Sequence, residues 1–262
     1  MSDRYPHVFS PIKLGPVEIK NRFYFSPHGS PYVVGSGPSD NFAYYYGARA
    51  AGGCGLCIHA LSVMPGRGGL GVTPYLEESI PSFRAAAKVV HDNGGKIFGD
   101  VHYSWVNNEW MYEPGSPRAP TFAPSPIQMH DDFFVTHEMS VATINKVVEA
   151  HKISARNLGR AGYDGFALSC THGMLVEAFL SPYFNRRTDE YGGSLENRMR
   201  FVVECLQAAR EGAGPNLAVG MRYNANEMVP SGLTTDDTRD ILARLVARQL
   251  LDYVEIEVGL EP

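Results

Sequence analysis

Short, strongly apolar runs alternate along the chain with longer segments in which apolar residues recur at helical spacing. The clearest run, residues 55–61, is bounded by glycines and shows no polar alternation, which predicts a strand buried on both faces. The runs that predict strands cover residues 23–26, 55–61, 96–101, 165–169, 217–223 and 253–258. Ahead of the second run, residues 8–22 predict a small hairpin with Leu14 to Val17 as its turn.

Helices are predicted in the intervals between these strands. Asp40, Ser194 and Thr235 are residue types that favour helix starts, and Gly94-Gly95 is a typical helix end. The predicted helices begin after Asp40 and cover residues 79–93, 140–161, 194–211 and 235–249. Two long loops, residues 102–136 and the segment before Ser194, follow the third and fourth strands. Loops of such length are usually functional or mobile.

Repeated alternation of strand and helix predicts parallel strands with helices outside them. Either a doubly wound sheet or a barrel satisfies this pattern. A closed barrel of this type needs eight strands, whereas about six are predicted here in addition to the hairpin. Either the sheet is open or the chain is incomplete.

The composition is that of an ordinary globular protein and narrows the possible partners. The 262 residues are 44% hydrophobic and 19% charged, with a net charge of −5. This balance gives no electrostatic footprint for nucleic acid or for an anionic membrane. Neither a membrane span nor a signal peptide is evident. With four cysteines, too few for a disulfide scaffold, we expect a reducing, cytoplasmic location.

Residues 179–201 read FLSPYFNRRTDEYGGSLENRMRF, a long run of unusual residue types. This run is similar to the signature of the old yellow enzyme family of NADH:flavin oxidoreductases. Other segments that resemble the family are residues 9–23, 26–28, 52–53, 162–165 and 171–173. The resemblance covers nearly the whole chain. It implies an α/β fold of the TIM (β/α)8 type, with residues 1–262 forming one FMN-binding barrel domain behind an N-terminal hairpin cap.

Within that family the chain looks closest to the multidomain branch of dienoyl reductases, enoate reductases and trimethylamine dehydrogenase. The resemblance implies FMN as cofactor, NAD(P)H as electron donor, and a 4Fe-4S cluster only in a longer form. About six of the eight βα units are present, so the domain is expected to be incomplete at its C-terminal end. The seventh and eighth strands, whose loops hold the flavin phosphate in the family, have no counterpart here.

The resemblance also implies which residues contact the flavin. Arg222, at the end of the fifth strand, matches the arginine that stabilises the negative charge of the reduced ring. Asp100 ends the third strand, where relatives place a glutamine or glutamate on the pyrimidine edge. The remaining predicted flavin contacts are Ser26, Pro27, His28, Gly29 and Ala60. Because glycine replaces the cysteine of trimethylamine dehydrogenase at position 29, the flavin is expected to be dissociable.

On the substrate side, His172 matches the family histidine that donates a hydrogen bond to a substrate carbonyl oxygen. Such a donor stabilises the enolate formed when hydride adds to the β-carbon. The neighbouring substrate positions depart from the family, because Ser169 replaces a histidine or tyrosine and Met174 replaces the usual proton-donating tyrosine. A thioether carries no proton. The proton must then come from water, Tyr103 or Tyr32.

Two further motifs are given structural interpretations. Cys54 and Cys57 form a C-x-x-C motif, but it enters an apolar strand and lacks a second ligand pair, so buried thiols are predicted and no metal site. Residues 66–71 satisfy G-x-G-x-x-G, but Thr73-Pro74 follows where a dinucleotide fold needs a helix. In the signature, Arg187, Asp189, Asn197 and Arg198 are predicted to form a buried network that orders a loop.

Three functions stay open at this point. The leading hypothesis is an FMN-dependent oxidoreductase that reduces an activated C=C bond of a small molecule with NAD(P)H. A second is flavin-dependent oxidation of a small amine. A third is an inactive, truncated barrel whose exposed strand edges favour aggregation or pairing with another chain, including a homo-oligomer. Ser169 and Met174 do not separate the first two.

Overall fold

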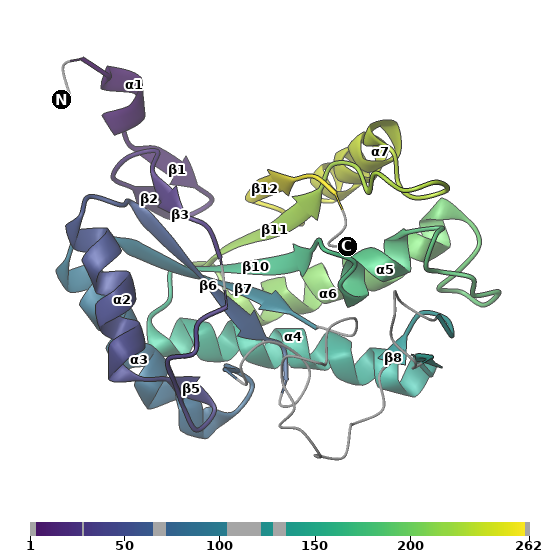
Figure 1. Cartoon of the computed structure of the whole chain (residues 1–262), viewed down its shortest axis with the longest axis horizontal. Helices are drawn as coiled ribbons and strands as arrows, with labels where there is room; N and C mark the ends of the chain where they lie inside the picture. Colours follow the sequence, from purple (N-terminus) through teal and green to yellow (C-terminus); the bar gives the residue numbers. More distant parts are fainter. Residues whose placement is uncertain (1–3, 28, 65–71, 104–121, 128–134, 260–262) are drawn as a thin grey trace.

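The computed structural model describes residues 4–27, 29–64, 72–103, 122–127 and 135–259, and its centre is a six-stranded parallel sheet (Figure 1). The strands lie across the sheet in chain order. They are β3 (Tyr24–Phe25), β6 (Leu56–Ser62), β7 (Lys96–His102), β10 (Gly165–Cys170), β11 (Ala218–Asn224) and β12 (Tyr253–Glu257). All six strands predicted from the apolar runs are confirmed. Their sequential, parallel order is that of successive units of a (β/α) barrel.

Five helices lie along the outer side of the curled sheet, so that the described part of the chain forms a half-barrel (Figure 1). They are α2 (Asp40–Ala51), α3 (Ile80–Asp92), α4 (Val141–Ala161), α6 (Leu195–Ala213) and α7 (Thr235–Ala247). The four helices predicted with both bounds are confirmed to within two residues at either end, and α2 begins at Asp40 as predicted. Within the described ranges, no helix combines the length and the apolar character needed to cross a membrane.

The N-terminal hairpin is shorter than predicted. It consists of β1 (Ile12–Leu14) and β2 (Val17–Ile19), paired antiparallel around a turn at Gly15. Val8 and Phe9, predicted to belong to it, lie instead in the short helix α1 (Pro6–Phe9). Pro6 stands at the first turn of α1, where its fixed φ favours a helix start. The hairpin assignment of Val8 and Phe9 was therefore wrong.

The structure contains several small elements that the sequence did not predict. The most important is α5 (Leu175–Leu180), which follows β10 and is buried along its whole length. The others are β4 (Val33–Val34), β5 (Gly37–Pro38), η1 (Glu77–Ser79), β8 (Phe122–Ala123) and β9 (His137–Glu138). Because α5 follows β10, it lies close to the carboxyl ends of the strands.

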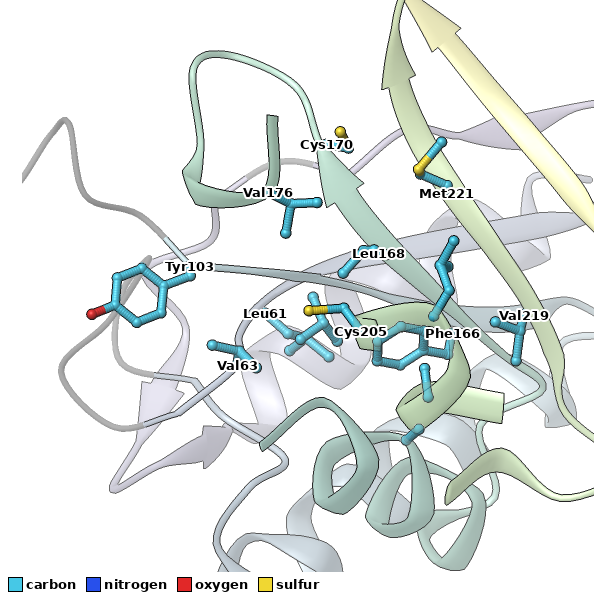
Figure 2. Packing of buried hydrophobic residues seen from close by; sticks show 14 of the residues in the cluster. Leu61, Val63, Tyr103, Phe166, Leu168, Cys170, Val176, Cys205, Val219 and Met221 are labelled. Atoms are coloured by element: carbon cyan, nitrogen blue, oxygen red, sulfur yellow. The ribbon is translucent and has the colours of Figure 1, made fainter. Parts of the chain in front are cut away.

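Side chains on the outer face of the sheet form the main hydrophobic core with the helices. Figure 2 shows part of it, with Phe166 and Leu168 of β10 beside Val219 and Met221 of β11. All four side chains are buried, as is Cys205, which reaches them from α6. This layer explains why the parallel strands read as continuous apolar runs, since their outward residues are covered by helices.

The inner face carries a second, smaller apolar cluster at the amino ends of the strands. Phe98 of β7 and Ile58 of β6 pack there with Ile19 of the hairpin, and Tyr253 packs against them from β12. The ring of Tyr253 lies where a Cβ on Gly220 would be, 2.4 Å from ring carbons, so only glycine leaves room for it. A cavity of about 430 Å³ lies beside this cluster, lined by the hairpin, β3, β6 and β12.

Candidate active site at the carboxyl ends of the strands

Polar and charged side chains gather on the inner face where the strands end. Successive inward positions lie two residues apart, so β7 places Asp100 and His102 there, and β12 places Glu255 and Glu257. Parallel pairing sets Arg222 of β11 opposite Glu255. The register of the sheet thus brings an arginine, a histidine and three carboxyl groups from β7, β11 and β12 to the carboxyl ends of the strands.

Arg222 is held by both glutamates of β12. Its Nη2 contacts Glu257 Oε2, and its Nε lies 3.9 Å from Glu255 Oε1. Glu255 Oε1 also accepts hydrogen bonds from Ser26 Oγ at 2.9 Å and from Tyr24 Oη at 3.3 Å. Glu255 therefore connects β12 to the residues of β3, the strand at the opposite edge of the sheet.

His172 enters the cluster from the turn that follows β10. Its Nε2 lies 2.6 Å from Glu257 Oε1. His172 and Gly173 both have left-handed backbone conformations, with φ of 57° and 69°, which costs energy for a residue other than glycine. Glu257 therefore contacts His172 through one oxygen and Arg222 through the other.

Glu177 of α5 stabilises the turn at His172 and Gly173. It is fully buried, and its Oε2 accepts a hydrogen bond from the Gly173 N–H at 2.6 Å. Its Oε1 accepts a second one from Asn224 Nδ2 at 2.7 Å, at the end of β11. Glu177 thus joins the turn that carries His172 to the strand that carries Arg222.

Burial changes the protonation of several of these groups. Loss of solvent, with a smaller contribution from Glu255 and against the opposing charge of Arg222, raises the pKa of Asp100 to about 7. Burial together with Arg222 lowers the pKa of His102 to about 4, so its imidazole is neutral at neutral pH. Burial and the neighbouring Glu227 raise the pKa of Glu177 to about 8. For Glu257, burial is outweighed by His172 and Arg222, and its pKa is lowered.

Of the substrate positions predicted from the sequence, three lie together. Ser169 is buried at the end of β10, and its Oγ lies 3.7 Å from the Met174 sulfur. His172 stands between them in the same turn. Tyr103 is buried in the main hydrophobic core, beside Val63 and Val176 in Figure 2. The ring of Tyr32 lies 5.8 Å from that of Tyr45 and is partly exposed. Whether either tyrosine donates a proton stays a prediction.

The predicted flavin contacts come from four different strands. Ala60 of β6 is directly opposite Asp100 in the sheet register, and Ser26 contacts Glu255. Pro27 is buried, whereas Gly29 is exposed, with open space where a Cβ would stand. His28 lies outside the described residues, as do residues 66–71 of the glycine-rich motif. Roles for these positions remain predictions.

Four residues of this site were not predicted from the sequence: His102, Glu177, Glu255 and Glu257. Three of them could have been predicted, because alternate residues of a strand face the same side of the sheet. His102 lies two residues after Asp100, and the segment Tyr253 to Glu257 places both glutamates on the inner face with Tyr253. Glu177 gave no such signal, because its helix was not predicted.

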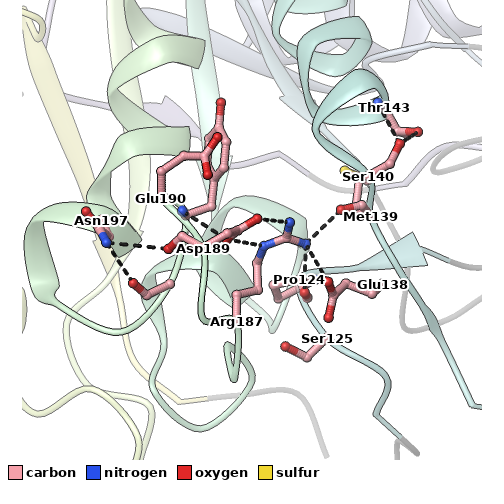
Figure 3. Close-up of polar contacts among 12 residues, drawn as sticks. Pro124, Ser125, Glu138, Met139, Ser140, Thr143, Arg187, Asp189, Glu190 and Asn197 are labelled. Atoms are coloured by element: carbon pink, nitrogen blue, oxygen red, sulfur yellow. Dashed lines mark hydrogen bonds and ion pairs between the residues drawn. The ribbon is translucent and has the colours of Figure 1, made fainter.

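The predicted network of the signature segment is confirmed in part, because Arg187 is buried and paired with Asp189, whereas Asp189, Asn197 and Arg198 are only partly buried. Figure 3 shows Arg187 donating to the carbonyl oxygens of Pro124 and Met139 and to the Asp189 carboxylate. Asn197 donates to the Gly192 carbonyl oxygen at 3.0 Å. Arg198 also bonds backbone carbonyls, those of Leu180 and Gly193. All these partners are structural, which agrees with the prediction of loop ordering.

The C-x-x-C motif lies at the amino end of β6, away from this site. Cys57 is buried, as predicted, whereas Cys54 is partly exposed. Interaction with Cys57 lowers the pKa of Cys54 to about 7. Within the described ranges, no three His, Cys, Asp or Glu side chains are grouped so as to hold a metal ion.

Comparison with known proteins gives this geometry a context. Residues 7–258 match the NADH:flavin oxidoreductase / NADH oxidase family. The chain belongs to this family. It is 32% identical, over 94% of its length, to N,N-dimethylglycine/sarcosine dehydrogenase of Chromohalobacter salexigens, of which it covers 36%. It is also 32% identical to the NADPH dehydrogenase of Geobacillus sp. strain WCH70, over 96% of this chain and 73% of that protein.

Solved structures support the same assignment. A 2-naphthoyl-CoA reductase superposes with a TM-score of 0.88 at 25% identity, over 98% of this chain and 41% of the reductase. Old yellow enzyme barrels are among the structural matches, which confirms the predicted (β/α) barrel architecture. The chain spans 34% to 40% of the length of three of its curated relatives.

The residues at the strand ends suit the polar edge of a flavin ring. Among the buried polar atoms without a hydrogen-bond partner in the described part of the chain, Arg222 Nε, Asp100 Oδ1 and His102 Nδ1 belong to this site. Buried polar atoms are normally paired, so such orphans indicate a missing partner. The pyrimidine edge of a flavin offers both carbonyl acceptors and an N–H donor. Arg222 would serve the former and Asp100 the latter.

Proposed function

We propose that this chain carries the flavin-binding face of an FMN-dependent oxidoreductase that uses NAD(P)H to reduce an activated C=C bond. The observation that carries the proposal is the convergence of Arg222, Asp100 and His172 at the carboxyl ends of neighbouring strands. In barrels of this architecture catalytic residues lie at that end. The family assignment and the NADPH dehydrogenase relative support the same chemistry.

Bound FMN would supply the chemistry of hydride acceptance and donation. The residues of this chain would position it: Arg222 beside the pyrimidine carbonyl, Asp100 at the ring N–H, and Ser26 to Gly29 along one side. His172 would orient the substrate by hydrogen bonding its carbonyl oxygen. We take residues 1–262 as part of one barrel domain, acting in the cytoplasm and able to form oligomers. An iron–sulfur cluster would belong only to a longer form.

Oxidation of a small amine is the second candidate, and the carboxylates of β12 favour it. Glu255 and Glu257 face the same site as His172, and an ammonium group is attracted to such a surface. The relative named N,N-dimethylglycine/sarcosine dehydrogenase agrees with this alternative. Two measurements would separate the candidates. One is NADH oxidation coupled to reduction of an enone, and the other is anaerobic reduction of the bound flavin by sarcosine.

The visible spectrum of the purified chain with added FMN, repeated anaerobically after NADH, tests the proposal. We expect a perturbed flavin spectrum that NADH bleaches. Arg222→Met should weaken FMN binding at least tenfold, because the ring carbonyl loses a charged donor. The matched control is Arg239→Met, since the Arg239 side chain is 78% exposed on α7. Unperturbed flavin in the wild-type chain would instead support the inactive-fragment hypothesis.

A further inference from the structure

Glu257 occupies the position between the two residues expected to serve flavin and substrate. Its two oxygens contact His172, in the turn after β10, and Arg222 of β11. The Glu257 side chain is only 19% exposed, so solvent screens these contacts weakly.

The charges around Arg222 do not balance. Glu257 contacts the guanidinium group directly, and Glu255 stands 3.9 Å from its Nε. Arg222 also interacts electrostatically with Asp100, whose pKa is raised by burial. Burial keeps His102 neutral, so it adds no positive charge. The Arg222 guanidinium is thus faced by two carboxylates, of which Glu257 also contacts the His172 imidazole.

We propose that Glu257 is a positioning residue that neutralises Arg222 and thereby lowers the midpoint potential of the flavin bound beside it. This inference rests on the proposed function. Reduced flavin gains negative charge at the pyrimidine edge, which a free arginine would stabilise. A glutamate paired with that arginine disfavours this negative charge in two ways. It repels the charge directly, and it neutralises the arginine that would otherwise stabilise it. The bound flavin is then a stronger hydride donor and is harder to reduce.

Glu257 also fixes the place of His172. The turn at His172 and Gly173 has a left-handed backbone, and Glu257 holds its imidazole from the β12 side while Glu177 holds Gly173 from α5. A single residue therefore connects the substrate-orienting group to the flavin-tuning group. Removing only its charge should change the flavin more than it changes the fold.

The experiment uses Glu257→Gln, which retains shape and hydrogen-bonding capacity but removes the charge. We expect the ratio of reduced to oxidised bound FMN at a fixed solution potential to rise at least tenfold, about 30 mV for a two-electron couple. Glu255→Gln should give a smaller rise, because Glu255 is farther from Arg222. Glu18→Gln is the matched control, since Glu18 is exposed on the hairpin. A midpoint potential in Glu257→Gln equal to that of the control would overturn the inference while FMN binding still stands.

A measurement without flavin tests the contact itself. Urea unfolding of the wild-type chain, Glu257→Gln, Arg222→Met and the double variant gives a double-mutant cycle. Coupling between the two sites supports the contact, and additive effects overturn it regardless of the flavin result. If the wild-type chain binds no FMN, the proposed function fails and the potential shift fails with it. The cycle then still reports whether Glu257 and Arg222 are paired.

Discussion

The two ends of the inner sheet face are built from the same strands but differ completely in chemistry. On β7, the inward side chains pass from Phe98 at the amino end to Asp100 and His102 at the carboxyl end. On β12 they pass from Tyr253 to Glu255 and Glu257. One end is packed against the hairpin, whereas the other holds buried charge and polar atoms without partners. The comparison indicates that the amino end is built for apolar packing, and it is the carboxyl end to which we assign the proposed function.

The largest expected effect is on the pH dependence of the free energy of unfolding. It comes from Asp100, whose pKa rises from 3.8 to about 7 on folding. Between these values the folded chain keeps a proton that the unfolded chain has released. The contribution of Asp100 to stability is therefore complete below pH 4 and is lost as the pH rises through 7. Asp100→Asn cannot lose this proton, so its stability relative to wild type should rise by up to about 4 kcal/mol across the window.

Urea midpoints of wild type and Asp100→Asn between pH 5 and 8 would measure this difference. Asp236→Asn is the matched control, because the Asp236 side chain is 85% exposed. A constant difference between Asp100→Asn and wild type over this range would show that Asp100 does not keep a proton on folding.

At the apolar end, Phe98→Ala should have the next largest effect. Phe98 is fully buried, and its ring centroid lies 5.3 Å from that of Tyr253. Removing it leaves a cavity that costs about 3 to 4 kcal/mol in free energy of unfolding. Because Phe98 lies at the opposite end from Arg222, we expect FMN affinity to stay within about twofold of wild type.

Thermal melting and FMN titration of the same Phe98→Ala preparation would check both expectations. Phe98→Leu offers a milder variant with a smaller loss, should Phe98→Ala not fold. A large loss of FMN affinity in the milder variant would contradict the separation of the two ends.

The sequence predicts the strands and helices well because each parallel strand is a short apolar run and three of the outer helices, α4, α6 and α7, begin at a capping side chain. Ser140 and Ser194 both accept hydrogen bonds as helix caps, from Thr143 N and Asn197 N. What the local pattern could not predict was α5. Its six residues include Glu177, which is buried only because Gly173 and Asn224 satisfy it from other elements. Such tertiary contacts leave no periodic signal in the chain.

The site was predictable in part for a related reason. His172 and Arg222 follow directly from the resemblance, and the structure places both around one carboxylate. Glu257, the carboxylate that joins them, was missed, because its importance depends on the register between β11 and β12. Strand register is set by packing of the whole sheet rather than by neighbouring residues.

Glu177→Gln tests how a buried carboxyl group at the carboxyl end of the sheet affects both stability and substrate binding. Above pH 8, where Glu177 is ionised, both of its oxygens accept hydrogen bonds, so an amide must turn one N–H group toward a donor. We expect a loss of about 1 to 2 kcal/mol in free energy of unfolding. The turn carrying His172 should loosen as well, which would raise the KM for substrate more than it lowers kcat. Chemical denaturation and steady-state kinetics would measure the two effects.

The Glu177→Gln result has a matched comparison in Glu204→Gln. Glu204 accepts a hydrogen bond from Tyr191 Oη at 3.0 Å on α6 and does not contact the turn. A rise in KM of equal size in both variants would mean that Glu177 acts only through general stability.

The smallest expected effect comes from Thr234→Ala, at the start of α7. Thr234 and Asp237 form a capping box, in which the Thr234 side chain accepts from Asp237 N and the Asp237 side chain accepts from Thr234 N. Losing it should cost about 1 kcal/mol. Because α7 connects β11 to β12 from the outer side, melting curves should shift slightly while FMN affinity and midpoint potential stay unchanged. A shifted potential would mean that the helix start controls how Glu257 meets Arg222, and the outer layer would then share in tuning the site.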